Sequence, residues 1–259
     1  MCYNVTLLTR KKLKKAHREG ADSAQIAELE AQLEVLKRIY PPRYKASGFE
    51  HPHIPIIRQK GQLEMIRWGL VPRWAKNKEE AMGLMNRTLN ARVEGILERP
   101  SFKHSVIEGK RCLVLIDGFF EHHHLSKQAY PVHIEQRDGD MMMLAGVWEE
   151  WTDLATGEVH TTSSIVTTRA NGLMARIHNR PGSEGPRMPL ILNDAGAELW
   201  LSDIGHHDLQ PAIGQLAIPF PEDQLIYWTV RPLTGQASVP DGPQAIEAVE
   251  YPELAFSDI

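Results

Sequence analysis

The second residue of this 259-residue chain is a cysteine, and that position gives it chemistry that an internal cysteine lacks. A small residue after the initiator Met usually allows removal of Met1, so the mature chain can begin with Cys2. A leading cysteine carries an α-amine of pKa about 7.7–8.0 and a thiol of pKa about 8.5 on adjacent carbons. The amine can condense with an aldehyde to an imine, and the thiol can then close a thiazolidine ring. The alternative is that Cys2 stands there by chance.

Three polar side chains far apart in the sequence have types and positions that could serve a reaction. Asn90 lies in a polar segment, where a neutral amide can orient an amine without changing its charge. Glu121 comes just after a buried strand, which is a common position for a catalytic acid or base. His178 stands between two arginines, and neighbouring cations favour the neutral imidazole.

Aromatic and basic side chains suggest contacts with nucleic acid. A predicted strand ends at Trp68 and a loop leads to Trp74, whose flat rings suit base stacking. Core packing is the alternative for both indoles. Arg87 and Arg92 flank Asn90, and a guanidinium is a permanently charged, forked donor suited to phosphate.

Two groups of histidines are weak indications of a metal site. His51 and His53 have strand spacing but stand beside prolines. Of the histidines at 122–124, only His122 and His124 can share one face of a strand, and no third ligand follows at a recognisable spacing. We therefore expect no metal and no cofactor.

Composition predicts one intracellular domain. The apolar content of 42% is enough for one sizeable core, and the two cysteines, Cys2 and Cys112, lie far apart. The sequence has no apolar run long enough to span a membrane and no secretory signal, so no membrane partner is expected. Residues 1–130 carry a net charge of +9 and residues 131–259 carry −13. The basic half fits an anionic partner such as nucleic acid, and charge pairing across the fold is the alternative.

Hydrophobic periodicity predicts a mostly antiparallel, strand-rich centre with helices outside it. The stop at Pro41-Pro42 and the capping residues predict a helix over 22–39, and weaker patterns predict helices from about 91 to 100 and over 194–202. The expected strands are 3–8, 54–57, 63–68, 111–116, 130–135, 141–148, 161–168 and 225–230.

Five motifs in this order resemble the SRAP family, the SOS response-associated peptidases or abasic-site-processing proteins. They are Met1-Cys2, the WGLVPRW of 68–74, the NARVE of 90–94, the RCLV of 111–114 running to the DGFFE of 117–121, and His178 ahead of the RMPL of 187–190. The resemblance implies a single α+β domain over 1–259, built on a curved, barrel-like, mostly antiparallel sheet flanked by helices. Within it, 10–39 is expected to be a helical insertion and about 232–259 a Pro-rich acidic tail.

The resemblance also implies a protein that covalently traps abasic sites in single-stranded DNA, in the cytoplasm and on the nucleoid when DNA is bound. The expected catalytic residues are Cys2, Asn90, Glu121 and His178, and the expected DNA contacts are Arg92, Trp68, Trp74 and Arg87. The activity would be DNA–protein crosslinking, lyase-like, with thiol-dependent removal of Met1. A cysteine peptidase, limited to that self-processing or not, and a non-covalent single-stranded DNA-binding module remain alternatives. The sequence does not indicate an oligomeric state.

The chain departs from the family pattern at three places near these motifs. Members usually have Gly-Arg after the Cys, whereas Tyr3-Asn4 follow here, which removes a cation beside the nucleophile. Many members have Tyr-Asn-x-Ala-Pro before the first long strand, where this chain has the YKASG of 44–48. The aromatic residue usually found after the glutamate is replaced by His122.

Overall fold

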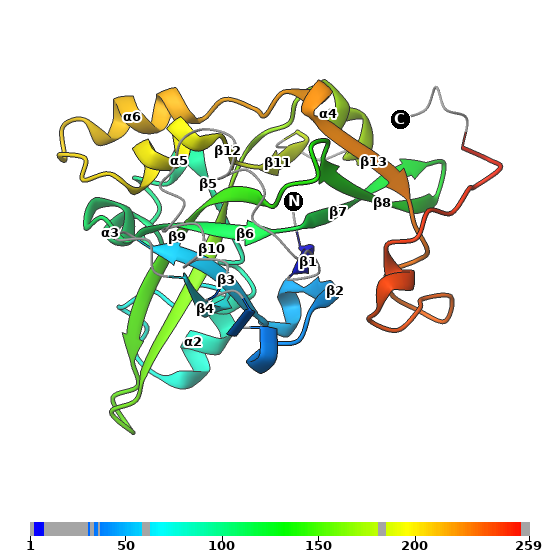
Figure 1. Cartoon of the computed structure of the whole chain (residues 1–259). Coiled ribbons are helices and arrows are strands. Elements are labelled where there is room, and N and C mark those ends of the chain that lie inside the picture. Colours follow the sequence, from blue (N-terminus) through cyan, green and yellow to red (C-terminus); the bar gives the residue numbers. More distant parts are fainter. Residues whose placement is uncertain are drawn as a thin grey trace.

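The centre of the molecule is a closed barrel of five strands (Figure 1). The computed structural model describes residues 3–7, 31, 34–35, 37–58, 63–180 and 185–254. Every pairing in the barrel is antiparallel except that of β10 with β4, and β9 closes the ring by pairing with β10. In ring order the strands are β10 (Val159–Arg169), β4 (Leu63–Trp68), β3 (His53–Arg58), β6 (Arg111–Ile116) and β9 (Met142–Thr152). This confirms the predicted single-domain α+β fold with a barrel-like sheet.

A second, open sheet of five strands holds the start of the chain. Its order is β13 (Leu225–Thr229), β8 (Gln128–Gln136), β7 (Gly118–Leu125), β1 (Asn4–Leu7) and β2 (Arg43–Ser47). Asn4 pairs with Phe120 on one side and with Ser47 on the other. The first described strand is therefore fixed on both edges. Three short strands extend the barrel sheet: β5 (Asn90–Arg92) and β11 (Arg187–Pro189) pair with β10, and β12 (Ile191–Leu192) pairs with β9.

The two sheets share one apolar core. Val5 of β1, Val114 of β6 and Ile134 of β8 belong to the same cluster, and each is 0% exposed. Leu113 belongs to a second cluster, together with Trp200 of α5. Apolar groups therefore cover both faces of β6, which explains why its sequence is an almost continuous apolar run.

Helices surround the strands (Figure 1). Asparagine caps three of them, because the side chains of Asn77, Asn171 and Asn193 each accept the backbone N–H three residues on. None of the helices in the described residues is long and apolar enough to cross a membrane. From residue 40 on, the helices of the described residues are α2 (Lys78–Met85), α3 (Lys103–Ile107), α4 (Gly172–Ile177), α5 (Asp194–Leu201) and α6 (Leu209–Leu216), and the 3-10 turns are η2 (Gly48–Glu50), η3 (Val93–Gly95), η4 (Glu222–Gln224) and η5 (Pro243–Ala245).

The helix expected from about residue 91 to Pro100 is wrong. Residues 90–92 form β5, which runs parallel to β10, and only η3 follows it as a helical turn. Ala91 is 0% exposed whereas its two neighbours are partly exposed, which is the alternation of a strand. Pairing with β10 thus outweighs a weak helical periodicity. The expected strands agree with the structure to within a few residues at each end.

The predicted helical insertion is described only in part. Within 31–39 the described residues are helical, and the chain straightens at Pro41-Pro42 as expected. Residues 8–30, which hold the basic run and the expected helix start, lie outside the described residues. The tail from 232 to 254 contains η5 and no other helix or strand.

The acidic tail is tied to the basic first half at β2. The Asp241 carboxylate accepts the backbone N–H groups of Tyr44 at 2.7 Å and Lys45 at 3.0 Å, and it forms an ion pair with Arg43. The Lys45 ammonium donates to the carbonyl oxygen of Leu233 at 3.1 Å. Part of the charge asymmetry is therefore used within the fold, as the alternative interpretation proposed.

Candidate active site

A glutamate facing an imidazole forms the centre of the site. Glu121 lies on β7 with 8% of its surface exposed, and His178 follows α4 directly as its C-cap. His178 Nδ1 is 3.3 Å from Glu121 Oε2 and 3.2 Å from the Arg187 carbonyl oxygen. Since both neighbouring oxygens accept hydrogen bonds, Nδ1 carries the proton in the neutral ring, which leaves Nε2 as the basic nitrogen. Two of the predicted catalytic residues are thus in contact.

Hydrogen bonds between β7 and the end of α4 hold this pair together. The Asn179 side chain accepts the backbone N–H of His124 at 2.7 Å and donates to its carbonyl oxygen at 2.9 Å. His123 Nδ1 lies 2.9 Å from the carbonyl oxygen of Arg176. Because these contacts lie on either side of His178, they fix the imidazole over the strand that carries Glu121. Neither Asn179 nor His123 was predicted to take part, because their role depends on a contact between distant segments.

β5 brings the predicted amide and the predicted phosphate-binding cation to one face. Asn90 and Arg92 are two residues apart on a strand, so their side chains point the same way. Burial lowers the pKa of Arg92, and the nearby positive charges of Arg187 and Arg99 lower it further. A guanidinium held among like charges is well suited to receive an anion.

The start of the chain lies beside the same groups. β1 pairs with β7 in a register that matches Asn4 with Phe120, so continuing it by one residue sets Tyr3 opposite Glu121. Tyr3 is also close enough to Arg92 to influence the pKa of that guanidinium. The predicted nucleophile, Cys2, lies outside the described residues.

Arg187 connects the two halves of the site. Its side chain is 6% exposed and pairs with Glu94 at 2.7 Å, while its backbone carbonyl contacts His178. The interaction with Arg92 places it beside β5 as well. Arg187 belongs to a motif of the resemblance, yet sequence reasoning gave it no role. The Arg187 carbonyl oxygen can therefore orient the His178 ring, while its guanidinium is anchored by Glu94.

The structure separates the predicted DNA-contacting residues into buried and exposed ones. Trp68 is 0% exposed and donates its ring N–H to the Leu89 carbonyl oxygen at 2.8 Å. No face of this ring is open to a base, so the expected stacking by Trp68 is wrong and the residue belongs to the core. Trp74 is 42% exposed, with its ring N–H 3.3 Å from the Pro100 carbonyl oxygen. Arg87, two residues after α2, is exposed.

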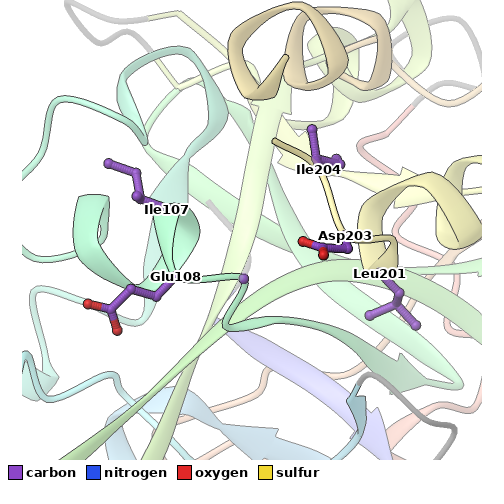
Figure 2. A pocket seen from close by; sticks show the side chains of 6 residues that line it. Ile107, Glu108, Leu201, Asp203 and Ile204 are labelled. Atoms are coloured by element: carbon purple, nitrogen blue, oxygen red, sulfur yellow. The ribbon is translucent and has the colours of Figure 1, made fainter. Parts of the chain in front are cut away.

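Two cavities lie elsewhere and have a different character. One of about 490 Å³ opens between the end of α3 and the segment after α5 (Figure 2). Another of about 290 Å³ lies against α2, and no predicted catalytic residue lines either cavity. The first is lined by Ile107, Glu108, Gly109, Leu201, Asp203 and Ile204.

The remaining candidate chemistry is limited. Cys112 is 0% exposed, and burial raises the pKa of its thiol, so it is inert as the sequence predicts. Among the described residues, no group of three or more His, Cys, Asp or Glu side chains is arranged to hold a metal ion. His122 and His124 share the face of β7 opposite to that of Glu121.

Comparison with known proteins identifies related sequences. The sequence profile of the family described as SOS response associated peptidase (SRAP) matches residues 1–237. The chain is 36% identical over 166 residues to "Abasic site processing protein YoqW" of Bacillus subtilis, covering 63% of this chain and 68% of that protein. It is 31% identical over 213 residues to YobE of the same organism, named likewise, covering 81% and 87%. "Abasic site processing protein HMCES" of Gallus gallus is 32% identical over 155 residues, which are 52% of this chain and 44% of HMCES.

Solved structures share the fold. A crystal structure of a protein from Bacteroides thetaiotaomicron superposes with a TM-score of 0.79 at 30% identity, covering 96% of this chain and 100% of the other. A protein from Bordetella bronchiseptica superposes with a TM-score of 0.65 at 20% identity, covering 88% and 99%. The barrel and the sheet that carries β1 and β7 therefore recur in other proteins.

Proposed function

This chain belongs to the SOS response-associated peptidase (SRAP) family, and from that premise we propose that it processes abasic sites by trapping them on Cys2 as a thiazolidine in single-stranded DNA. The names of its relatives support abasic-site processing. The observation that carries the proposal is the 3.3 Å contact between His178 and Glu121. Glu121 lies on β7, the strand that pairs with β1. Because consecutive Cα atoms lie about 3.8 Å apart, Cys2 cannot be far from Tyr3.

Ring opening of the sugar is the first step. An abasic deoxyribose is mostly a closed hemiacetal, so the C1′ hydroxyl must lose a proton and the ring oxygen must gain one. A neutral His178, with its basic Nε2 and a protonated Nδ1 held by acceptors, is suited to shuttle that proton. The product is an aldehyde at C1′.

Capture of the aldehyde follows. The free amine of Cys2, oriented by Asn90, attacks C1′, and Glu121 transfers a proton to the hydroxyl that leaves as water. The thiolate then adds to the imine carbon and the nitrogen takes up a proton. One water is released and no oxidant or reductant is needed, so the reaction balances with the groups named.

The DNA contacts follow from charge and exposure. Arg92 binds the phosphate next to the damaged sugar, and exposed Arg87 and Trp74 extend the contact along the strand. A single strand is preferred because its sugar enters the site without the cost of breaking base pairs. Trp68 takes no part in this interface.

A crosslinking assay tests the proposal. Purified protein is mixed with a single-stranded oligonucleotide that contains one abasic site, and the products are separated under denaturing conditions. We expect a stable adduct whose mass is the sum of protein without Met1 and DNA, less one water. Cys2→Ala should give no stable adduct. Cys2→Ser should give only an imine, which survives when borohydride reduces it.

A matched control separates a requirement for the free amine from a requirement for the fold. A version that keeps an uncleaved residue ahead of Cys2 retains the thiol and the whole chain, yet should form no adduct because its amine is acylated. An adduct from that version would contradict the proposed chemistry. Release of peptides from casein without an adduct would favour the cysteine peptidase instead.

A further inference from the structure

Two of the places where the chain departs from its family meet in space beside the active site. Tyr3 replaces the residue that usually follows the cysteine, and the segment around Gly48 replaces the usual Tyr-Asn-x-Ala-Pro. The Gly48 backbone N–H donates to the Tyr3 carbonyl oxygen at 2.7 Å. The rings of Tyr3 and Phe49 lie with centroids 5.0 Å apart and planes 33° apart. The two departures therefore contact each other, and their contact brings Tyr3 against Phe49, the residue that directly follows the second departure.

Phe49 is an exposed ring on a rigid turn. It is 56% exposed, whereas Tyr3 is packed against the main apolar core. The turn, η2, is closed by the His51 N–H, which donates to the Gly48 carbonyl oxygen at 3.0 Å. His51 Nδ1 also lies 2.9 Å from the Trp68 carbonyl oxygen. The Phe49 ring is therefore held in place beside Tyr3 and open to solvent, so that a ligand can contact it.

The closeness of Gly48 to the core explains why the turn is fixed. A Cβ added to Gly48 would lie 3.1 Å from the Trp68 ring and 3.2 Å from the Leu89 side chain. The backbone at Gly48 thus sits directly on buried side chains. The buried Trp68 supports the platform on which Phe49 stands, although it does not contact DNA itself.

The aromatic pair is continuous with the reacting groups. Tyr3 precedes the strand that pairs with β7, and its position influences the pKa of Arg92. A strand whose phosphate contacts Arg92 and whose abasic sugar faces Glu121 can bring its neighbouring nucleotide to these rings, because Tyr3 lies beside both groups. The occupant of the surface is therefore part of the same strand.

We propose that Tyr3 and Phe49 form a stacking platform for the base next to the abasic sugar. This inference rests on the proposed function and adds a nucleotide-binding subsite to it. Stacking on an aromatic ring contributes about 1–3 kcal/mol per base and tolerates any base. The family usually places a cation one residue after Tyr3, where the chain has Asn4, so stacking by Tyr3 and Phe49 here takes the place of a nearby ionic contact. Binding should consequently depend less on salt concentration than an ionic contact at that position would.

Fluorescence of a base analogue tests the platform directly. The oligonucleotide carries a tetrahydrofuran abasic analogue, which cannot open to an aldehyde, with 2-aminopurine on one side or the other. The intact wild-type protein should quench the 2-aminopurine on one of the two sides when it binds. Phe49→Ala should abolish the quenching and weaken binding by roughly 5- to 150-fold, the fold-change equivalent to the stacking energy. Phe49→Trp should retain both.

Two controls make the result specific to an aromatic ring at this place. Phe49→Leu keeps an apolar side chain without a π face and should behave as Phe49→Ala does. Leu154→Ala removes an apolar side chain that is 82% exposed in the turn between β9 and β10, and it should change neither binding nor quenching. Thermal unfolding checks that each variant is folded. We expect the Phe49 variants to fold, because removing an exposed ring leaves no internal cavity.

The outcomes separate the platform from the function it serves. Unchanged binding and quenching in Phe49→Ala, with crosslinking by the wild type intact, would overturn the platform and leave the proposed function standing. Failure of the wild type to crosslink a natural abasic site would overturn the function, whereas quenching on the unreactive analogue would still support the platform.

Discussion

Two buried glutamates in this molecule have nearly the same burial but opposite surroundings. Glu149 of β9 is 1% exposed and accepts hydrogen bonds from Ser105, from Arg73 and from Lys110. Glu121 of β7 is 8% exposed and faces a titratable imidazole at 3.3 Å. Burial alone therefore does not distinguish a catalytic carboxylate from a structural one.

The difference lies in what the partner can do with a proton. Burial alone would raise the pKa of Glu149, but hydrogen bonds from Lys110, from the Glu150 N–H and from other donors lower it below 4.5 overall. Held by permanent cations, that carboxylate is fixed in its charged form. Glu121 instead contacts His178, whose imidazole can both accept and donate a proton. Two substitutions of the same kind should consequently have opposite consequences.

Glu121→Gln should produce the largest effect on activity. The amide has the same shape but transfers no proton, so the rate of adduct formation should fall by about 10²–10⁴-fold. The free energy of unfolding should change by less than about 1 kcal/mol, because the contact with His178 survives as a neutral hydrogen bond. Single-turnover gels and urea unfolding measure the two quantities. A large loss of stability with a normal rate of adduct formation would mean that Glu121 is the structural glutamate, which would contradict the comparison.

Glu149→Gln should do the opposite. Removing the charge leaves the Lys110 ammonium and the Arg73 guanidinium without their buried anion, which should cost roughly 1–3 kcal/mol of unfolding free energy. The rate of adduct formation by the folded protein should stay within about twofold of the wild type, since none of these groups contacts the site. A large fall in the rate of adduct formation in Glu149→Gln would show that Glu149 influences the site of Glu121 and would contradict a purely structural role.

Asn179→Ala tests whether the proton-transfer pair needs its backbone clamp. Loss of the two hydrogen bonds to His124 frees the end of α4, so the rate should fall by about tenfold while DNA affinity stays the same. Rates measured across a range of pH distinguish a positioning role of Asn179 from a purely structural one. A displaced His178 would change the shape of the pH–rate profile as well as the maximal rate. A uniform fall that parallels thermal stability would indicate only a structural role.

Acidification should weaken the stabilising effect of Glu149. Its folded-state pKa lies below 4.5, so the stability that its charge contributes is present above the unfolded-state pKa and is lost as the pH falls through the folded-state value. The gap in unfolding free energy between wild type and Glu149→Gln should be full at about pH 7 and should shrink as the pH falls through the folded-state pKa. Urea unfolding at a series of pH values measures it, and a gap independent of pH would contradict the assigned cause.

Much of the fold could be predicted because the strands carry clear local patterns. The runs at 63–68 and 111–116 match β4 and β6 residue for residue. The segment 90–92 was mistaken for a helix start because β5 is short and depends on its partner β10 rather than on its own residues. Propensity gives little information when a strand has three residues and tertiary pairing decides its form.

The site was predicted only as far as single residue types allowed. Glu121 and His178 could be named, but their contact depends on Asn179 and His123, which link a strand to the end of a helix. Trp68 was assigned to DNA because an indole has the same sequence appearance on a surface as in a core. Phe49 was not predicted to take part, because its exposure and its contact with Tyr3 depend on the packing of two distant segments.

The bonds of Asp241 to β2 have a consequence for solubility as well as for shape. β2 is the last strand of its sheet, and an uncovered edge strand is a template on which another chain can extend the sheet and aggregate. The carboxylate occupies two of the outward N–H groups of that edge. Because β1 lies immediately inside β2, a residue near the end of the chain helps to keep the beginning in register and discourages filament growth from it.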